Sequence, residues 1–140
     1  MGKRSTGRKL AMQLLYQLDA QKSESDSVKT IFEEQAKFHE DTKEWALTLF
    51  EGAAKAQSEC DDLIIKYAIG WEIGRINSVD RCILRLAFYE LLHTETPFTV
   101  VVNEAIELCK RYSTEDSPKF VNGILGNYVK KECLQDSSKA

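Results

Sequence analysis

Helical periodicity is the feature that most constrains what this chain can fold into. Its 140 residues contain only two prolines, Pro97 and Pro118, and no stretch alternates polar and apolar residues convincingly over the length of a strand. Apolar residues instead recur every three or four positions, as Leu10, Leu14 and Leu18 do near the start. The pattern predicts an all-α fold of about seven helices. The clearest of them are expected near residues 6–20, 28–36, 41–60, 78–91, 99–112 and 117–129.

Polar residues that begin these segments predict where the helices are capped. Asp41 and Glu44 have the spacing of a capping box, in which the aspartate accepts a backbone N–H and the glutamate bonds back to the cap. Ser78 is expected to cap the most apolar helix. Asp116 or Ser117 is expected to cap the last one, where the proline that follows occupies the first turn without disturbing it.

The segment that begins at Ser78 is apolar on two sides. Its helical wheel shows two separate apolar stripes. The second stripe contains Leu84, Phe88 and Leu91, and Asp80 lies at its N-terminal end. A helix of this kind is usually the centre of a bundle, which accounts for Leu84 and Leu91. Phe88 is left open between the core and an exposed contact.

Two glycines lie inside the last expected helix, where each costs about 1 kcal/mol relative to alanine. Gly123 and Gly126 share a face with Lys119, Asn122 and Lys130, away from the apolar residues. Because glycine has no side chain, a polar chain could approach the backbone closely on this face. Another helix of the same protein could equally cross there.

Charge is distributed unevenly along the chain. The overall charge is −3, yet residues 1–18 carry +4 and the remainder −7. A basic arm on an acidic body favours a local contact with a polyanion, although a solvated basic tail has the same composition. The length and composition predict one domain.

Several classes of protein are disfavoured by the sequence. The four cysteines lie more than twenty residues apart with no C-x-x-C pair, so we expect core thiols, no metal site and no cofactor. No apolar run has the length of a membrane span, and the basic N-terminus lacks the apolar stretch of a secretory signal. These features predict a cytoplasmic protein with no membrane contact.

Three segments carry a resemblance to a known family. VDRCILRLAFYELL and VVNEAIELCKRYSTEDSPKFVNGIL closely resemble the NusB family of bacterial transcription antitermination factors. GRKLAMQLLYQLD resembles the arginine-rich first helix of that family, so the likeness extends from about residue 4 to residue 130.

The resemblance implies a fold of two small helical bundles packed roughly perpendicular to each other. The N-terminal bundle would cover residues 4–60 and the C-terminal bundle residues 61–132, before a short polar tail. It also implies a role without catalysis. The protein would bind the boxA element of nascent ribosomal RNA transcripts together with NusE, a small-subunit ribosomal protein. With other Nus factors it would act on RNA polymerase so that the enzyme reads through terminators.

The resemblance and the helix faces together give two sets of candidate site residues. The set expected to contact RNA comprises Lys3, Arg4, Arg8, Lys9, Asp116, Ser117, Lys119, Phe120 and Gly123. The set expected to contact NusE comprises Tyr16, Asp80, Leu84 and Phe88. We further expect the basic arm and the glycine face to form one continuous RNA surface.

Two other functions remain open at the level of sequence. A NusB-like domain forms the N-terminal part of some ribosomal RNA cytosine methyltransferases, although no glycine-rich loop after a strand is present here. A helical adaptor that binds only protein is the other alternative. The sequence leaves open whether the free protein is a monomer or a homodimer.

Overall fold

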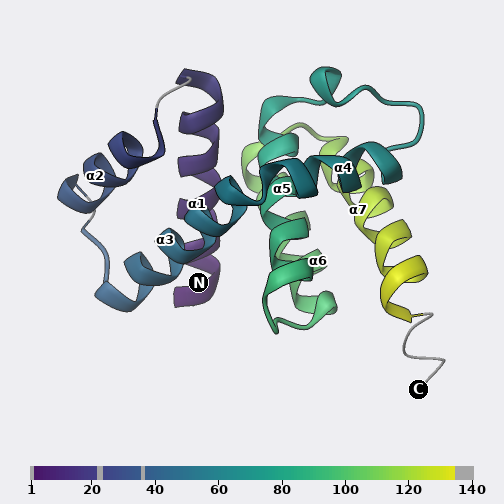
Figure 1. Cartoon of the computed structure of the whole chain (residues 1–140). Helices are drawn as coiled ribbons and strands as arrows, with labels where there is room; N and C mark the ends of the chain where they lie inside the picture. The colour runs from purple at the N-terminus through teal and green to yellow at the C-terminus, as the bar shows by residue number, and fades with distance from the viewer. Residues whose placement is uncertain (1, 22–23, 36, 135–140) are drawn as a thin grey trace.

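The computed structural model describes residues 2–21, 24–35 and 37–134, and it confirms the all-α prediction (Figure 1). A 3-10 turn, η1 (Ile73–Arg75), precedes α5, and a π-helical segment, η2 (Val129–Leu134), follows α7. The seven α-helices are α1 (Lys3–Gln21), α2 (Ser25–Gln35), α3 (Glu40–Lys55), α4 (Gln57–Tyr67), α5 (Ser78–His93), α6 (Phe98–Tyr112) and α7 (Ser117–Tyr128).

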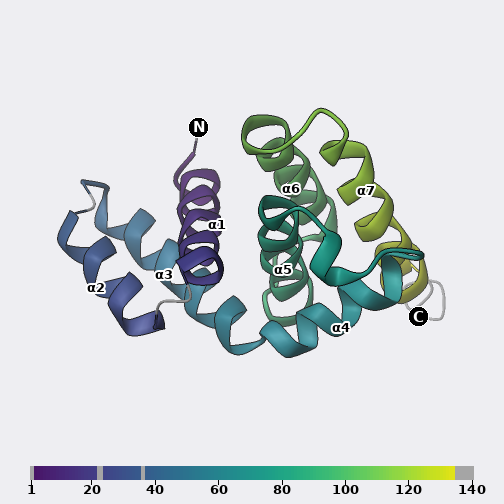
Figure 2. The same ribbon diagram turned by 90° about the horizontal axis from the view of Figure 1, so that it is seen from above.

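The helices form two groups that correspond to the two predicted bundles. Helices α1, α2 and α3 lie on one side, and α4, α5, α6 and α7 on the other (Figures 1 and 2). Helix α5 is central, because it packs against α1, α3, α4, α6 and α7. The boundary expected between residues 60 and 61 would fall inside α4, and the division into two units stays a prediction.

The central position of α5 explains why both of its apolar stripes are covered. Leu84 and Phe88 are each 0% exposed. The Phe88 ring meets Tyr128 edge to face, with centroids 5.3 Å apart, and Tyr128 meets Tyr67 in the same way at 5.7 Å. Their complete burial disfavours the expected contact of Leu84 and Phe88 with NusE, since helices of the same chain already occupy their surroundings. The contact stays a prediction.

Helix boundaries depart from the predicted caps by one or two residues. His39 caps α3, and its Nδ1 accepts the Asp41 backbone N–H at 3.2 Å. Asn77 caps α5, where its Oδ1 accepts the N–H of Val79 at 2.9 Å. The expected caps at Asp41 and Ser78 were therefore wrong: the acceptor comes from His39, two residues before Asp41, and from Asn77, the residue directly before Ser78. The long helix expected from residue 41 breaks at Ala56.

Three of the cysteines belong to the core, as expected. Cys60, Cys82 and Cys109 are buried. Burial raises the pKa of Cys60 and of Cys109 to about 12 and that of Cys82 to about 11. These thiols are therefore protonated at neutral pH and pack as small apolar groups.

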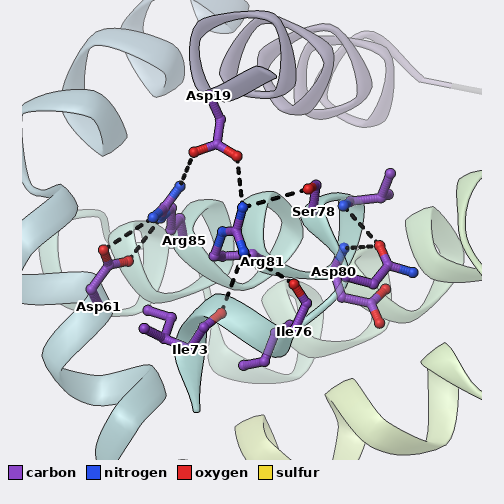
Figure 3. Close-up of polar contacts among 10 residues, drawn as sticks. Asp19, Asp61, Ile73, Ile76, Ser78, Asp80, Arg81 and Arg85 are labelled. Carbon is purple, nitrogen blue, oxygen red and sulfur yellow. Dashed lines mark hydrogen bonds and ion pairs between the residues drawn. The ribbon is translucent and has the colours of Figure 1, made fainter. Parts of the chain in front are cut away.

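A network of ion pairs joins the two groups of helices at the end of α1 (Figure 3). The Asp19 carboxylate accepts from Arg81 Nη2 at 2.8 Å and from Arg85 Nη1 at 3.3 Å. Arg85 also donates from Nε to Asp61 on α4, at 2.7 Å. Arg81 Nη1 donates to the backbone oxygen of Ile76 at 3.0 Å. One carboxylate on α1 thus holds two arginines of α5.

We expect Asp19→Asn to destabilise the protein near neutral pH and to have a smaller effect in acid. Burial by itself would raise the pKa of Asp19, but the hydrogen bonds and charges of Arg81 and Arg85 outweigh it and hold that pKa below 3.8. The ordinary aspartate pKa is 3.8. Because folding lowers this pKa, the ionised carboxylate stabilises the folded state at pH values above 3.8. The contribution is then lost as the pH falls through the lower pKa of the folded state.

Urea unfolding of the parent and of Asp19→Asn tests this expectation across a pH series from about 7 down to about 3, a range that brackets the ordinary aspartate pKa. The difference in unfolding free energy should shrink below about pH 4. A difference that stays constant over the whole series would contradict a linked titration of Asp19.

Candidate nucleic-acid interface

The basic arm forms the first turns of α1 and lies against α3. Lys3 is exposed, with Nζ 3.6 Å from Asp41 Oδ2. Arg4 is exposed and its guanidinium lies over the Trp45 ring, with Cζ 3.9 Å from the ring centroid. Lys9 is half-buried. We call Lys3, Arg4 and Lys9 the arm patch.

Arg8 does not belong to this exposed surface. It is 4% exposed, and its Nε and Nη2 both donate to the Glu90 carboxylate at 2.9 Å. Its Nη1 also lies 3.7 Å from Glu104 Oε1. This burial disfavours the expected contact of Arg8 with RNA phosphates, because α5 and α6 supply carboxylates that satisfy its charge inside the protein. The contact stays a prediction.

Asp80 and Ser117 are likewise internal. Asp80 is 4% exposed, and it accepts from Ser113 Oγ at 2.6 Å and from Ser117 Oγ at 2.8 Å. Ser117 is 1% exposed. Both side chains are enclosed because the turn between α6 and α7 folds over the N-terminus of α5. This burial disfavours the expected NusE contact at Asp80 and RNA contact at Ser117, which stay predictions. Asp116 is the N-cap residue of α7, as expected, but its side chain makes no capping hydrogen bond.

Exposed polar and aromatic groups remain at the start of α7. Asp116 and Lys119 are exposed, and Phe120 is half-buried. The Phe120 ring meets Trp71 edge on, with centroids 5.1 Å apart, and Trp71 is 53% exposed. Trp71 was not among the residues predicted for the site, although its position in the glycine-flanked segment GWEIG was a signal. We call Asp116, Lys119, Phe120, Gly123 and Trp71 the α7 patch.

The glycine face opens to solvent. A Cβ built on Gly123 or Gly126 would meet no heavy atom of the described chain within 4 Å outside its own helical neighbourhood. No helix crosses there in the part of the chain that the structure describes, which contradicts the internal-packing alternative. The face is free for a ligand.

The two patches lie at opposite ends of α5. Arg8, beside the arm patch on α1, is bound to Glu90 near the C-terminal end of α5. Ser117, beside the α7 patch, is bound to Asp80 near the N-terminal end of α5. Ten residues of helix separate Asp80 from Glu90, a rise of about 15 Å. The structure thus describes two patches, and the single continuous RNA surface expected from the sequence stays a prediction. Tyr16, which is 41% exposed, lies on the outer side of α1 about 18 Å along the helix from Arg4.

The fold and these surfaces define an all-helical binding protein with two separate exposed patches of cations and aromatic rings. The NusB family model matches residues 5–130. The chain is 46% identical to the transcription antitermination protein NusB of Acetivibrio thermocellus, covering 96% of this chain and 92% of that protein. The chain belongs to the NusB family.

Solved structures agree with this assignment. The structure described as T. maritima NusB superposes with a TM-score of 0.83 at 36% identity, covering 100% of this chain and 99% of that one. A structure described as antitermination factors NusB and NusE in complex with dsRNA matches with a TM-score of 0.82 at 30% identity, covering 93% and 98%. The similarity thus spans nearly the full length of both relatives.

Two negative observations apply to the described ranges. Within residues 2–21, 24–35 and 37–134, no helix combines the length and apolar character needed to cross a bilayer. The same residues contain no group of three or more His, Cys, Asp or Glu side chains that could hold a metal ion.

Proposed function

We propose that this protein is a transcription antitermination factor that binds boxA RNA of nascent ribosomal RNA transcripts together with NusE. The observation that carries the proposal is the NusB family match over residues 5–130, supported by the similarity to a structure of NusB and NusE with RNA. With other Nus factors the protein would help RNA polymerase to read through terminators, in the cytoplasm, where bacterial transcription takes place. It would act by binding and not by catalysis.

The two patches suggest how RNA would be held. The arm patch offers ammonium and guanidinium groups to phosphates, which supply most of the affinity for a nucleic acid. The α7 patch combines Lys119 with the pair of exposed Trp71 and half-buried Phe120, a combination that suits the stacking of single-stranded bases. Tyr16 is the remaining candidate for NusE contact, because an exposed tyrosine is a common interface anchor.

The alternatives have less support. The chain covers 92% of the length of the Acetivibrio thermocellus protein and 100% of the Nitratiruptor one, so the likeness is not confined to the N-terminal part of a longer enzyme. A protein-only adaptor would not need the open glycine face or the exposed Lys119 ammonium, which forms no ion pair with the described residues. Both features favour an RNA-binding role.

A titration of labelled boxA-type RNA tests the proposal directly. The RNA is titrated with this protein, with and without NusE, at two salt concentrations, and a scrambled RNA of the same length is the control. We expect preferential binding of boxA-type RNA, strengthened by NusE and weakened by salt, and Tyr16→Ala should remove only the NusE effect. Equal binding of both RNAs would overturn the proposal, and NusE binding without RNA binding would favour the adaptor.

We expect substitutions at Gly123 to separate folding from RNA binding. Gly123→Ala removes a helix-interior glycine in open space, so it should raise the unfolding free energy by up to about 1 kcal/mol. Gly123→Leu should fold equally well but weaken RNA binding, because it adds bulk to the exposed backbone without changing charge. Thermal unfolding and the RNA titration on both variants provide the measurement. Unchanged RNA affinity in the stable Leu variant would show that RNA does not approach this face.

A further inference from the structure

Trp45 contacts the first turns of α1, and the proposed function assigns this residue no role. It lies half-buried on α3, with its ring under the Arg4 guanidinium at 3.9 Å from Cζ to the ring centroid. Its Nε1 donates to the Arg4 backbone oxygen at 3.2 Å. The same indole thus holds both the main chain and the side chain of Arg4.

Gly7 makes this close contact possible. A Cβ at that position would lie 2.4 Å from Trp45 Cδ1, so any larger residue would push the indole away from α1. Arg8 also approaches the ring, at 5.6 Å, but its guanidinium is committed to Glu90. The indole is therefore fixed in place, and Arg4 is the cation that it presents to solvent.

Two neighbouring cations of the arm are paired with carboxylates, whereas Arg4 is not paired with any in the described part of the chain. Lys3 lies 3.6 Å from an Asp41 carboxylate oxygen, and Arg8 is neutralised by Glu90. Among the described residues, Arg4 has no carboxylate within ion-pair distance. A guanidinium with one face on an aromatic ring keeps its N–H donors in a fixed plane, with its edge available for a phosphate.

We propose that Trp45 is a positioning residue for RNA binding: it holds the Arg4 guanidinium flat, so that the N–H edge is preset to receive an RNA phosphate. The inference rests on the proposed function. Trp45 need not touch RNA, because its effect acts through Arg4. Preorganisation of a flexible arginine reduces the side-chain freedom that would otherwise be lost on binding.

A double-mutant cycle between Trp45 and Arg4 tests this role. The variants are Trp45→Leu, Arg4→Ala and their combination, with Lys55→Ala as a control that removes an exposed charge from the other end of α3. Affinity for labelled boxA-type RNA is measured with NusE over a salt series, and helicity and melting temperature are recorded for each protein.

The expected results distinguish positioning from a structural role. Arg4→Ala should lower the slope of log affinity against log salt by about 0.7, the value for one phosphate on a single strand. Trp45→Leu should weaken RNA binding about two- to fivefold when Arg4 is present, the range of an exposed cation–π contact, and should have no effect in the Arg4→Ala background. Lys55→Ala should leave the affinity within the range of the parent.

The proposal is overturned if Trp45→Leu weakens binding equally in both backgrounds, or in neither. If the leucine variant unfolds, Trp45→Met replaces it in the same cycle, since it keeps apolar volume on α3 but removes the ring that Arg4 lies over. Failure of the parent to prefer boxA-type RNA would instead remove the proposed function, which the parent's own titration detects.

Discussion

Arg8→Ala is expected to cost about 3 to 5 kcal/mol of unfolding free energy, because it leaves the Glu90 carboxylate buried without its partner. The two side chains are 5% and 2% exposed and lie 2.9 Å apart, and they join α1 to the central helix α5. Urea unfolding followed by far-UV circular dichroism measures the loss. RNA binding of this variant should fail along with folding.

Two controls separate the buried pair from charge in general. Lys3→Ala removes an arm cation whose pair with Asp41 is exposed, so its cost should be at most about 1 kcal/mol. The double variant Arg8→Met with Glu90→Leu replaces both ions by apolar groups of similar size, and it should recover most of the stability lost by Arg8→Ala. A folded, fully stable Arg8→Ala with weakened RNA binding would restore Arg8 to the RNA surface.

Phe88→Ala is expected to lose about 3 to 5 kcal/mol of stability, the usual cost of truncating a buried phenylalanine. The ring is 0% exposed and packs edge to face on Tyr128, so its removal leaves a cavity between α5 and α7. Thermal and urea unfolding measure the loss, and Phe88→Leu should lose less because it fills more of the space.

Trp71→Ala is the matched control for Phe88. Trp71 is also aromatic but is 53% exposed, so its truncation should cost much less stability and should act on RNA binding instead. Near-native stability of Phe88→Ala combined with weakened NusE binding would mean that Phe88 lies at an interface after all.

Most of the fold could be predicted because the regular spacing of apolar residues along the sequence is a reliable signal of helices. The segments from residues 78 and 99 and the proline start of the last helix agree closely with α5, α6 and α7. The break at Ala56 was missed because no glycine or proline marks it; tertiary packing of α4 against α5 and α7 accompanies it. Caps were misplaced where a neighbouring His or Asn competes for the same backbone N–H groups.

The site was predicted less well, for a physical reason. A helical wheel shows which side of its own helix a residue occupies, but it does not show which other segment covers that side. Arg8 is covered by carboxylates from α5 and α6, and Asp80 by the two serines of the α6–α7 turn. In contrast, Tyr16 and Lys119 were placed on the polar faces of their helices, and both are exposed.

The ionic anchors on α1 have a consequence for the length of RNA that the protein recognises. Arg8 is bound to Glu90 at one end of α5, and Asp19 is bound to Arg81 and Arg85 toward the other, about 16 Å apart along α1. Helix α1 is thus fastened to α5 at two points and cannot slide along it. The arm patch and the α7 patch therefore keep a constant separation. An RNA that reaches both patches must exceed a minimum length. When RNAs of increasing length are compared, affinity should therefore rise abruptly at that length and not gradually.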